Sequence, residues 1–118
     1  LPAFRAAEAL LVADATERKA GPLVMATGGG AVEMAEVCQQ LSLWRCFWLD
    51  APDSILLDRC REGSRPLLEG DDPGRLLGQL RGRRETSYRL LSGDPIETEG
   101  ISPSRVVDAI LSRLEEAI

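Results

Sequence analysis

The chain has 118 residues, of which 44% are hydrophobic and 28% charged, and its net charge is −5. This length allows one domain with a modest core, and an acidic chain is poorly suited to non-specific nucleic-acid binding. No apolar run reaches the roughly 20 residues that a membrane helix requires. We therefore predict one soluble domain over residues 1–118, with neither nucleic acid nor membrane as its partner.

Helices and short apolar runs alternate along the first half of the chain. Residues 3–19 carry apolar side chains at helical spacing and end in basic residues before Gly21, which predicts a helix that stops there. Residues 22–27 and 44–50 are apolar runs of strand length, and residues 32–42 between them are predicted to be helical. Because the chain starts inside a helix and without methionine, we expect it to be a piece of a longer protein.

The second half continues this alternation. The predicted elements are a helix from Asp53 or Ser54 to about Arg59, a loop over 60–74, a helix over 75–92, an edge strand in DPIETEG, and a helix from Ser102 with Pro103 in its first turn. Strands that alternate with helices predict a parallel α/β sheet.

The cysteines Cys38, Cys46 and Cys60 have no CxxC spacing, and the chain has no histidine. A zinc site and a catalytic cysteine paired with histidine are therefore both excluded, and we predict no metal site in this chain. We interpret the three thiols as buried or half-buried groups in a reducing cytoplasm.

The stretch VMATGGGAV, residues 24–32, places Gly28, Gly29 and Gly30 between a predicted strand and a predicted helix. Ligands of parallel α/β sheets bind beyond the carboxyl ends of the strands, where glycine lets the backbone approach them closely. The run therefore predicts contact with an oxygen-rich ligand, with a flexible turn as the alternative. A dinucleotide fingerprint is excluded, because Glu33 stands where GxGxxG requires its last glycine.

All basic residues except Lys19 are arginines. Guanidinium groups bind phosphate and carboxylate bidentately, so a loop carrying Arg59, Arg61 and Arg65 fits a lid that closes over phosphates. The alternative is a solvated face on which these arginines pair with neighbouring acids.

Five motifs follow one another along the chain: FRxxE at Phe4–Glu8, then GGGAV, WLDAP, RPLL at 65–68, and RxxxY at Arg84–Tyr88. In this order the chain resembles the shikimate kinase family over about the last two thirds of that family's domain. The resemblance implies a three-layer P-loop kinase fold of the nucleoside monophosphate kinase type, with a five-stranded parallel sheet. It implies ATP- and Mg²⁺-dependent phosphorylation of the 3-hydroxyl of shikimate, in aromatic amino-acid biosynthesis, by a cytoplasmic monomer.

The resemblance also implies roles for single residues. Arg5 and Arg84 would bind the carboxylate of shikimate from two sides, with Arg83 as the alternative to Arg84, and the glycine run would contact the ring and its hydroxyls. Glu8 would orient an arginine rather than act as a base.

The nucleotide side of the site would come from the lid and from a later loop. Arg65 would reach the transferring phosphate as the catalytic arginine and contact ATP, and Arg59 would flank the adenine. Pro103 falls near the family's adenine-contacting loop.

The chain also departs from the family. The P-loop motif GxxxxGK[ST] and the acidic residues that hold magnesium do not occur in it, so the N-terminal strands and P-loop are absent and we expect no measurable phosphorylation by these residues alone. In the family, the first strand lies between the two strands that match residues 22–27 and 44–50. Without that first strand, we expect the strands over 22–27 and 44–50 either to stay apart or to pair abnormally with each other. The alternatives are a non-catalytic kinase-like binding module and another small-molecule kinase, such as a gluconate kinase.

Overall fold

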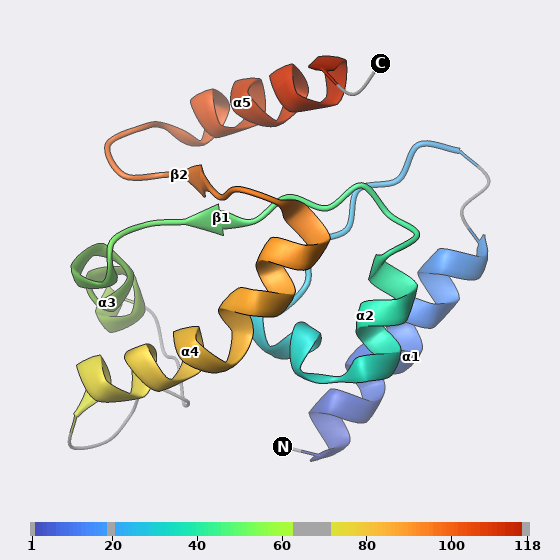
Figure 1. Ribbon diagram of the computed structural model, residues 1–118, viewed down its shortest axis with the longest axis horizontal. Coiled ribbons are helices and arrows are strands. Elements are labelled where there is room, and N and C mark those ends of the chain that lie inside the picture. Colours follow the sequence, from blue (N-terminus) through green and yellow to red (C-terminus); the bar gives the residue numbers. More distant parts are fainter. Residues whose placement is uncertain (1, 19–20, 63–71, 117–118) are drawn as a thin grey trace.

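The computed structural model describes residues 2–18, 21–62 and 72–116. Its elements, in chain order, are α1 (Pro2–Arg18), the short 3₁₀ helix η1 (Gly29–Glu33), α2 (Ala35–Leu41), β1 (Leu49–Asp50), α3 (Asp53–Glu62), α4 (Pro73–Ser92), β2 (Ile96–Glu97) and α5 (Pro103–Glu116) (Figure 1). The helices predicted around residues 3–19, 53–59, 75–92 and 102–118 are confirmed, with small shifts of their ends.

The long helix α4 has clear start and stop signals. The Asp72 carboxylate accepts a hydrogen bond from the backbone N–H of Arg75 at 3.0 Å, and Pro73 occupies the first helical position, where its missing N–H costs nothing. At the other end Gly93 has φ 72°, a left-handed conformation that glycine adopts without strain, and its N–H donates to the Arg89 carbonyl. These signals fix the helix that carries the candidate residue Arg84.

The strands β1 and β2 pair in parallel, with Leu49 opposite Ile96 and Asp50 opposite Glu97. In Figure 1, α5 lies on one side of this pair, and α3 and α4 lie on the other. The predicted parallel α/β arrangement is therefore present, but the described residues form a sheet of two strands instead of five. The strand predicted over 44–50 shrinks to its last two residues.

The strand predicted over residues 22–27 is wrong, because residues 22–28 form no regular element. A strand is stable only when a neighbour accepts and donates its backbone hydrogen bonds. Within the described ranges, no backbone hydrogen bond joins this segment to 44–50, so abnormal direct pairing of the two is not observed either. Val24 is 96% exposed and Leu23 is exposed too, so of the large apolar side chains in this segment only Met25 packs against the core.

Two further boundaries differ from the prediction. The helix expected over 32–42 is divided at Met34, which has an extended conformation, into η1 and α2. The loop expected over 60–74 is too long, because α3 continues to Glu62 and α4 begins at Pro73. Glycine and proline in this segment suggested a loop, but proline at a first helical position marks the start of α4. The remainder, residues 63–71, lies outside the described residues.

The core lies where α1, η1 and α2 meet. Its buried members are Val12, Ala31, Val32, Val37 and Leu41. Ala31 and Val32 directly follow the glycine run, so their burial fixes its position. Among the described residues, large apolar side chains outside this core are exposed, for example Leu10, Leu11 and Leu90, so much apolar surface stays uncovered. None of the helices in the described ranges is long and apolar enough to cross a membrane.

Candidate functional site

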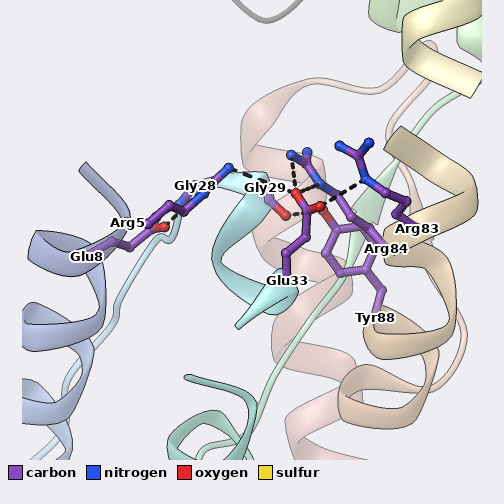
Figure 2. A network of polar contacts seen from close by, with 8 residues as sticks. All are labelled: Arg5, Glu8, Gly28, Gly29, Glu33, Arg83, Arg84 and Tyr88. Atoms are coloured by element: carbon purple, nitrogen blue, oxygen red, sulfur yellow. Dashed lines mark hydrogen bonds and ion pairs between the residues drawn. The ribbon is translucent and has the colours of Figure 1, made fainter. Parts of the chain in front are cut away.

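The glycine run lies between helix α1 on one side and helix α4 on the other (Figure 2). Arg5 and Glu8 share a face of α1 because they are three residues apart, and Arg84 and Tyr88 share a face of α4 because they are four apart. Both faces point toward the run, so side chains from distant parts of the sequence meet there.

On the α1 side, Arg5 lies directly against Gly30. A Cβ atom on Gly30 would lie 1.9 Å from Arg5 Nη2, so only glycine fits beneath this guanidinium. Glu8 holds Arg5 through an ion pair of 3.0 Å, and its other oxygen accepts the Gly28 N–H at 3.1 Å. Glu8 therefore ties Arg5 to the glycine backbone, which fits the orienting role predicted for it.

On the α4 side, Arg84 and Tyr88 contact Gly29. A Cβ atom on Gly29 would lie 3.1 Å from Arg84 Nη1 and 3.3 Å from the Tyr88 hydroxyl, which donates a hydrogen bond to the Gly29 carbonyl. The Tyr88 ring is held in turn by Trp48, with the ring centroids 5.4 Å apart. Burial raises the pKa of Tyr88 and the Arg84 charge opposes this, so the hydroxyl stays protonated as a donor at neutral pH.

A carboxylate of the chain itself occupies the centre of the cluster. Glu33 Oε2 lies 2.9 Å from Arg84 Nε and 2.8 Å from Arg84 Nη2, and Glu33 Oε1 lies 3.0 Å from Arg83 Nε. Arg5 Nη2 is 3.9 Å from the same Oε2 atom. Sequence reasoning missed this role, since Glu33 served only to exclude a dinucleotide motif. Its place directly after GGGAV was the signal available.

Partial burial of Glu33 raises the pKa of its carboxyl group, but hydrogen bonds and charges from Arg84 and Arg83 outweigh this, and the net pKa is lowered. A carboxyl group whose pKa is lower in the folded state stabilises the fold above its ordinary pKa of 4.5. The stabilisation by ionised Glu33 is lost as the pH falls through the lowered pKa of its carboxyl group.

We therefore expect Glu33→Gln to lower the free energy of unfolding at pH 7 and to lower it progressively less below about pH 4.5, because protonated Glu33 resembles glutamine. Urea unfolding of both proteins at a series of pH values measures this difference. Glu36→Gln, on the exposed start of α2, is the control and should show no such pH dependence. A difference between wild type and Glu33→Gln that stayed constant down to pH 3 would contradict the expectation.

A second arginine network holds α4 against the end of the sheet. Arg81 Nη1 and Nη2 donate to the two Asp50 carboxylate oxygens at 3.0 and 3.2 Å, and Arg81 Nε donates to Asp53 at 2.9 Å. Asp50 ends β1 and Asp53 begins α3, so Arg81 joins three elements. Arg84 lies one turn further along α4, and its position at the glycine run depends on this anchor. The sequence analysis gave Asp53 only as a possible helix start and Asp50 only as part of the WLDAP motif, and it assigned no role to Arg81.

The predicted nucleotide residues lie elsewhere. Arg59 Nη1 donates to the Thr98 hydroxyl at 3.0 Å, just beyond the end of β2, and Pro103 is the exposed first residue of α5. Among the described contacts, neither residue touches the glycine run. Arg65 lies outside the described residues. The structure thus brings together Arg5, Arg84 and the three glycines, and it places Arg59 and Pro103 away from them.

The fold and the cluster define an α/β protein with a small arginine-lined site built on a glycine turn. A family model for shikimate kinase matches residues 1–115. The chain therefore belongs to the shikimate kinase family, a family of phosphotransferases. This confirms the predicted family and, with it, the prediction of a kinase.

Named relatives agree with this assignment. The chain is 40% identical over 117 residues to a shikimate kinase of Pseudomonas savastanoi pv. phaseolicola, covering 98% of this chain and 67% of that protein. It is 33% identical over 116 residues to one of Rhodococcus jostii, covering 98% of this chain and 68% of that protein. The chain thus spans about two thirds of the length of these relatives.

Proposed function

We propose that this chain carries the acceptor site of an enzyme that transfers the γ-phosphoryl group of ATP to the 3-hydroxyl of shikimate. One observation carries the proposal: Arg5 and Arg84, from two helices, face the same three glycines from opposite sides. A backbone without side chains gives a flat sugar-like ring a surface to lie on, and two guanidinium groups give its carboxylate paired donors.

The charge of the cluster supports a ligand with a single negative charge. Arg5, Arg83 and Arg84 contribute three positive charges, and Glu8 and Glu33 contribute two negative ones, so one positive charge remains. Shikimate carries one carboxylate, which would neutralise that charge. Arg84 is only 9% exposed, so its interaction with a carboxylate is weakly screened by water.

For the nucleotide we propose Arg59, Arg65 and Pro103 as contacts. This proposal rests only on the match between their positions and the nucleotide-contacting positions of the shikimate kinase family.

Between residues 2 and 116, leaving out 19–20 and 63–71, no group of three or more Asp, Glu, Cys or His side chains is arranged to hold a metal ion. The described residues therefore form no ready-made metal site with three such protein ligands. Likewise, the P-loop motif is not found in these 118 residues. We accordingly propose that they bind shikimate but do not turn it over alone.

The test combines binding and turnover on one sample. Calorimetric titration with shikimate should show binding, with gluconate as the control ligand that should bind far more weakly. Release of ADP from Mg-ATP in the presence of shikimate should be undetectable for the 118 residues. Turnover would contradict the proposed inactivity of the isolated chain while supporting the kinase assignment. Absence of shikimate binding by a folded sample would overturn the proposed acceptor site.

A second candidate is a kinase-like binding module without catalytic activity. The observation in its favour is the same lack of a P-loop motif in the sequence. Assay of a longer form of the protein separates the two candidates, because a kinase would release ADP with shikimate and a binding module would not. A cytoplasmic location and a monomeric state stay predictions.

A further inference from the structure

Glu33 occupies the edge of Arg84 that an external carboxylate would use. An arginine binds a carboxylate most strongly through two parallel hydrogen bonds from one edge of its guanidinium group. The edge formed by Nε and Nη2 of Arg84 is already taken by Glu33 Oε2, at 2.9 and 2.8 Å (Figure 2). The chain therefore places its own carboxylate where a ligand carboxylate is expected.

The remaining guanidinium nitrogen of Arg84, Nη1, lies close to protein, and only 11% of the Arg84 side chain is exposed. Arg84 Nη1 lies against Gly29, so close that a Cβ atom there would be 3.1 Å away, with the Tyr88 hydroxyl beside it. A ligand therefore has no equally good edge to choose on this buried arginine. To form two parallel hydrogen bonds with Arg84, it has to replace Glu33.

Glu33 has a second partner that makes this replacement possible. Its Oε1 atom already accepts a hydrogen bond from Arg83 Nε at 3.0 Å. The Arg83 side chain is 59% exposed, whereas that of Arg84 is 11% exposed. Glu33 can therefore leave the buried arginine and keep the exposed one, so that its charge never loses its partner.

Arg84 does not depend on Glu33 alone for its position. It packs against Gly29 and Tyr88, and Tyr88 is fixed by its hydrogen bond to Gly29 and by Trp48. Since these contacts persist when Glu33 moves, the arginine stays in place to receive a ligand. If Glu33 served only to position Arg84, the arginine would move out of place when Glu33 left it.

We propose that Glu33 is an intramolecular competitor that occupies Arg84 in the free protein and is displaced onto Arg83 by the carboxylate of the acceptor substrate. This inference rests on the proposed function and adds to it a residue that sets substrate affinity. Ligands that cannot form the paired hydrogen bonds to Arg84 do not displace Glu33, so the competition favours carboxylates over simpler anions.

The test is calorimetric titration of shikimate into the wild-type chain and into Glu33→Gln, which keeps the size of the side chain and removes its charge. We expect the dissociation constant of the variant to be about fivefold lower, the ratio that corresponds to loss of one partly exposed ion pair. Glu33→Asp, which keeps the charge but reaches Arg84 less well, should also bind more tightly, by a smaller factor. Circular dichroism establishes that each variant is folded.

A double variant separates competition from overall charge. Glu33→Gln combined with Arg83→Gln has the same net charge as the wild type, so tighter binding by this variant cannot come from added positive charge. We expect it, too, to bind shikimate more tightly than the wild type. Glu36→Gln removes a negative charge from α2 outside the cluster and should leave the dissociation constant unchanged.

The outcomes distinguish this inference from the proposed function. Shikimate binding to the wild type, with equal or weaker binding by Glu33→Gln and by the double variant, overturns the competitor role and leaves the acceptor site standing. Absence of shikimate binding by wild type and all variants overturns both. Tighter binding by the charge-matched double variant supports both.

Discussion

Arg84→Lys is expected to weaken shikimate binding by about 10- to 100-fold. Lysine keeps the positive charge but replaces a planar fork by a single point charge, so the paired hydrogen bonds to the carboxylate are lost. Hydrogen bonds to charged groups contribute about 1.5–3 kcal/mol, which corresponds to this range. Arg84 is nearly buried, so water cannot replace the missing donors. Calorimetric titration with shikimate gives the ratio directly.

Arg89→Lys is the matched control for this change. Arg89 lies on the same helix, its side chain is 51% exposed, and it contacts Glu85, Asp94 and the ring of Trp48, whose centroid is 5.3 Å from Arg89 Cζ. Lysine keeps the positive charge on which all three contacts depend. Since exposed ion pairs contribute little, the same substitution there should leave shikimate binding unaltered. Equal affinities of Arg84→Lys and the wild type would show that Arg84 does not bind the acceptor carboxylate.

Gly30→Ala is expected to reduce shikimate affinity at least about tenfold while changing the free energy of unfolding by less than about 1 kcal/mol. The new Cβ atom would lie 1.9 Å from Arg5 Nη2, and the nearest atoms all belong to the end of the Arg5 side chain. A flexible side-chain end moves at little cost, so the fold survives. Arg5, however, is pushed away from the glycine run and from the ligand.

Gly82→Ala is the control for this second prediction. Gly82 lies within α4, and apart from its chain neighbours and the backbone of the helix itself no atom lies within 4 Å of a Cβ atom built there. Alanine in an exposed helix interior raises stability by about 0.5–1 kcal/mol, and shikimate binding should not change. Urea unfolding and calorimetry of both variants check the pair. A Gly30→Ala chain that bound shikimate like the wild type would refute the proposed contact between Arg5 and the ligand.

The helices could be predicted from the sequence because their signals are local. Gly93 at the end of α4 and the cap at Ser102 before α5 act within a few residues of the chain. Pro73 at the start of α4 is equally local, but it was interpreted as part of a loop. The strands could not be predicted in this way, because a strand forms only where a neighbouring strand exchanges backbone hydrogen bonds with it. Residues 22–27 have the composition of a strand but no ladder, whereas Leu49–Asp50 gain one from Ile96–Glu97.

The same distinction applies to the site. Arg5, Arg84 and the glycine run were found because each belongs to a motif, and the structure brings them together. Glu33 and Arg81 were missed because an acid or a base in a charged chain has no distinctive pattern until its partners are placed in space. Glu33 meets Arg84 across 51 positions and Arg81 meets Asp50 across 31, so only the fold reveals these contacts.

The central claim is that Arg5 and Arg84 together hold the carboxylate of the acceptor. Two-dimensional NMR of the arginine Nε–Hε groups during titration with shikimate tests it most directly, with the signals assigned by Arg→Lys variants. We predict that the signals of Arg5 and Arg84 shift with one common dissociation constant, while those of Arg105 and Arg113 on α5 stay in place. Saturable binding of shikimate that left the Arg5 and Arg84 signals unmoved would contradict the account.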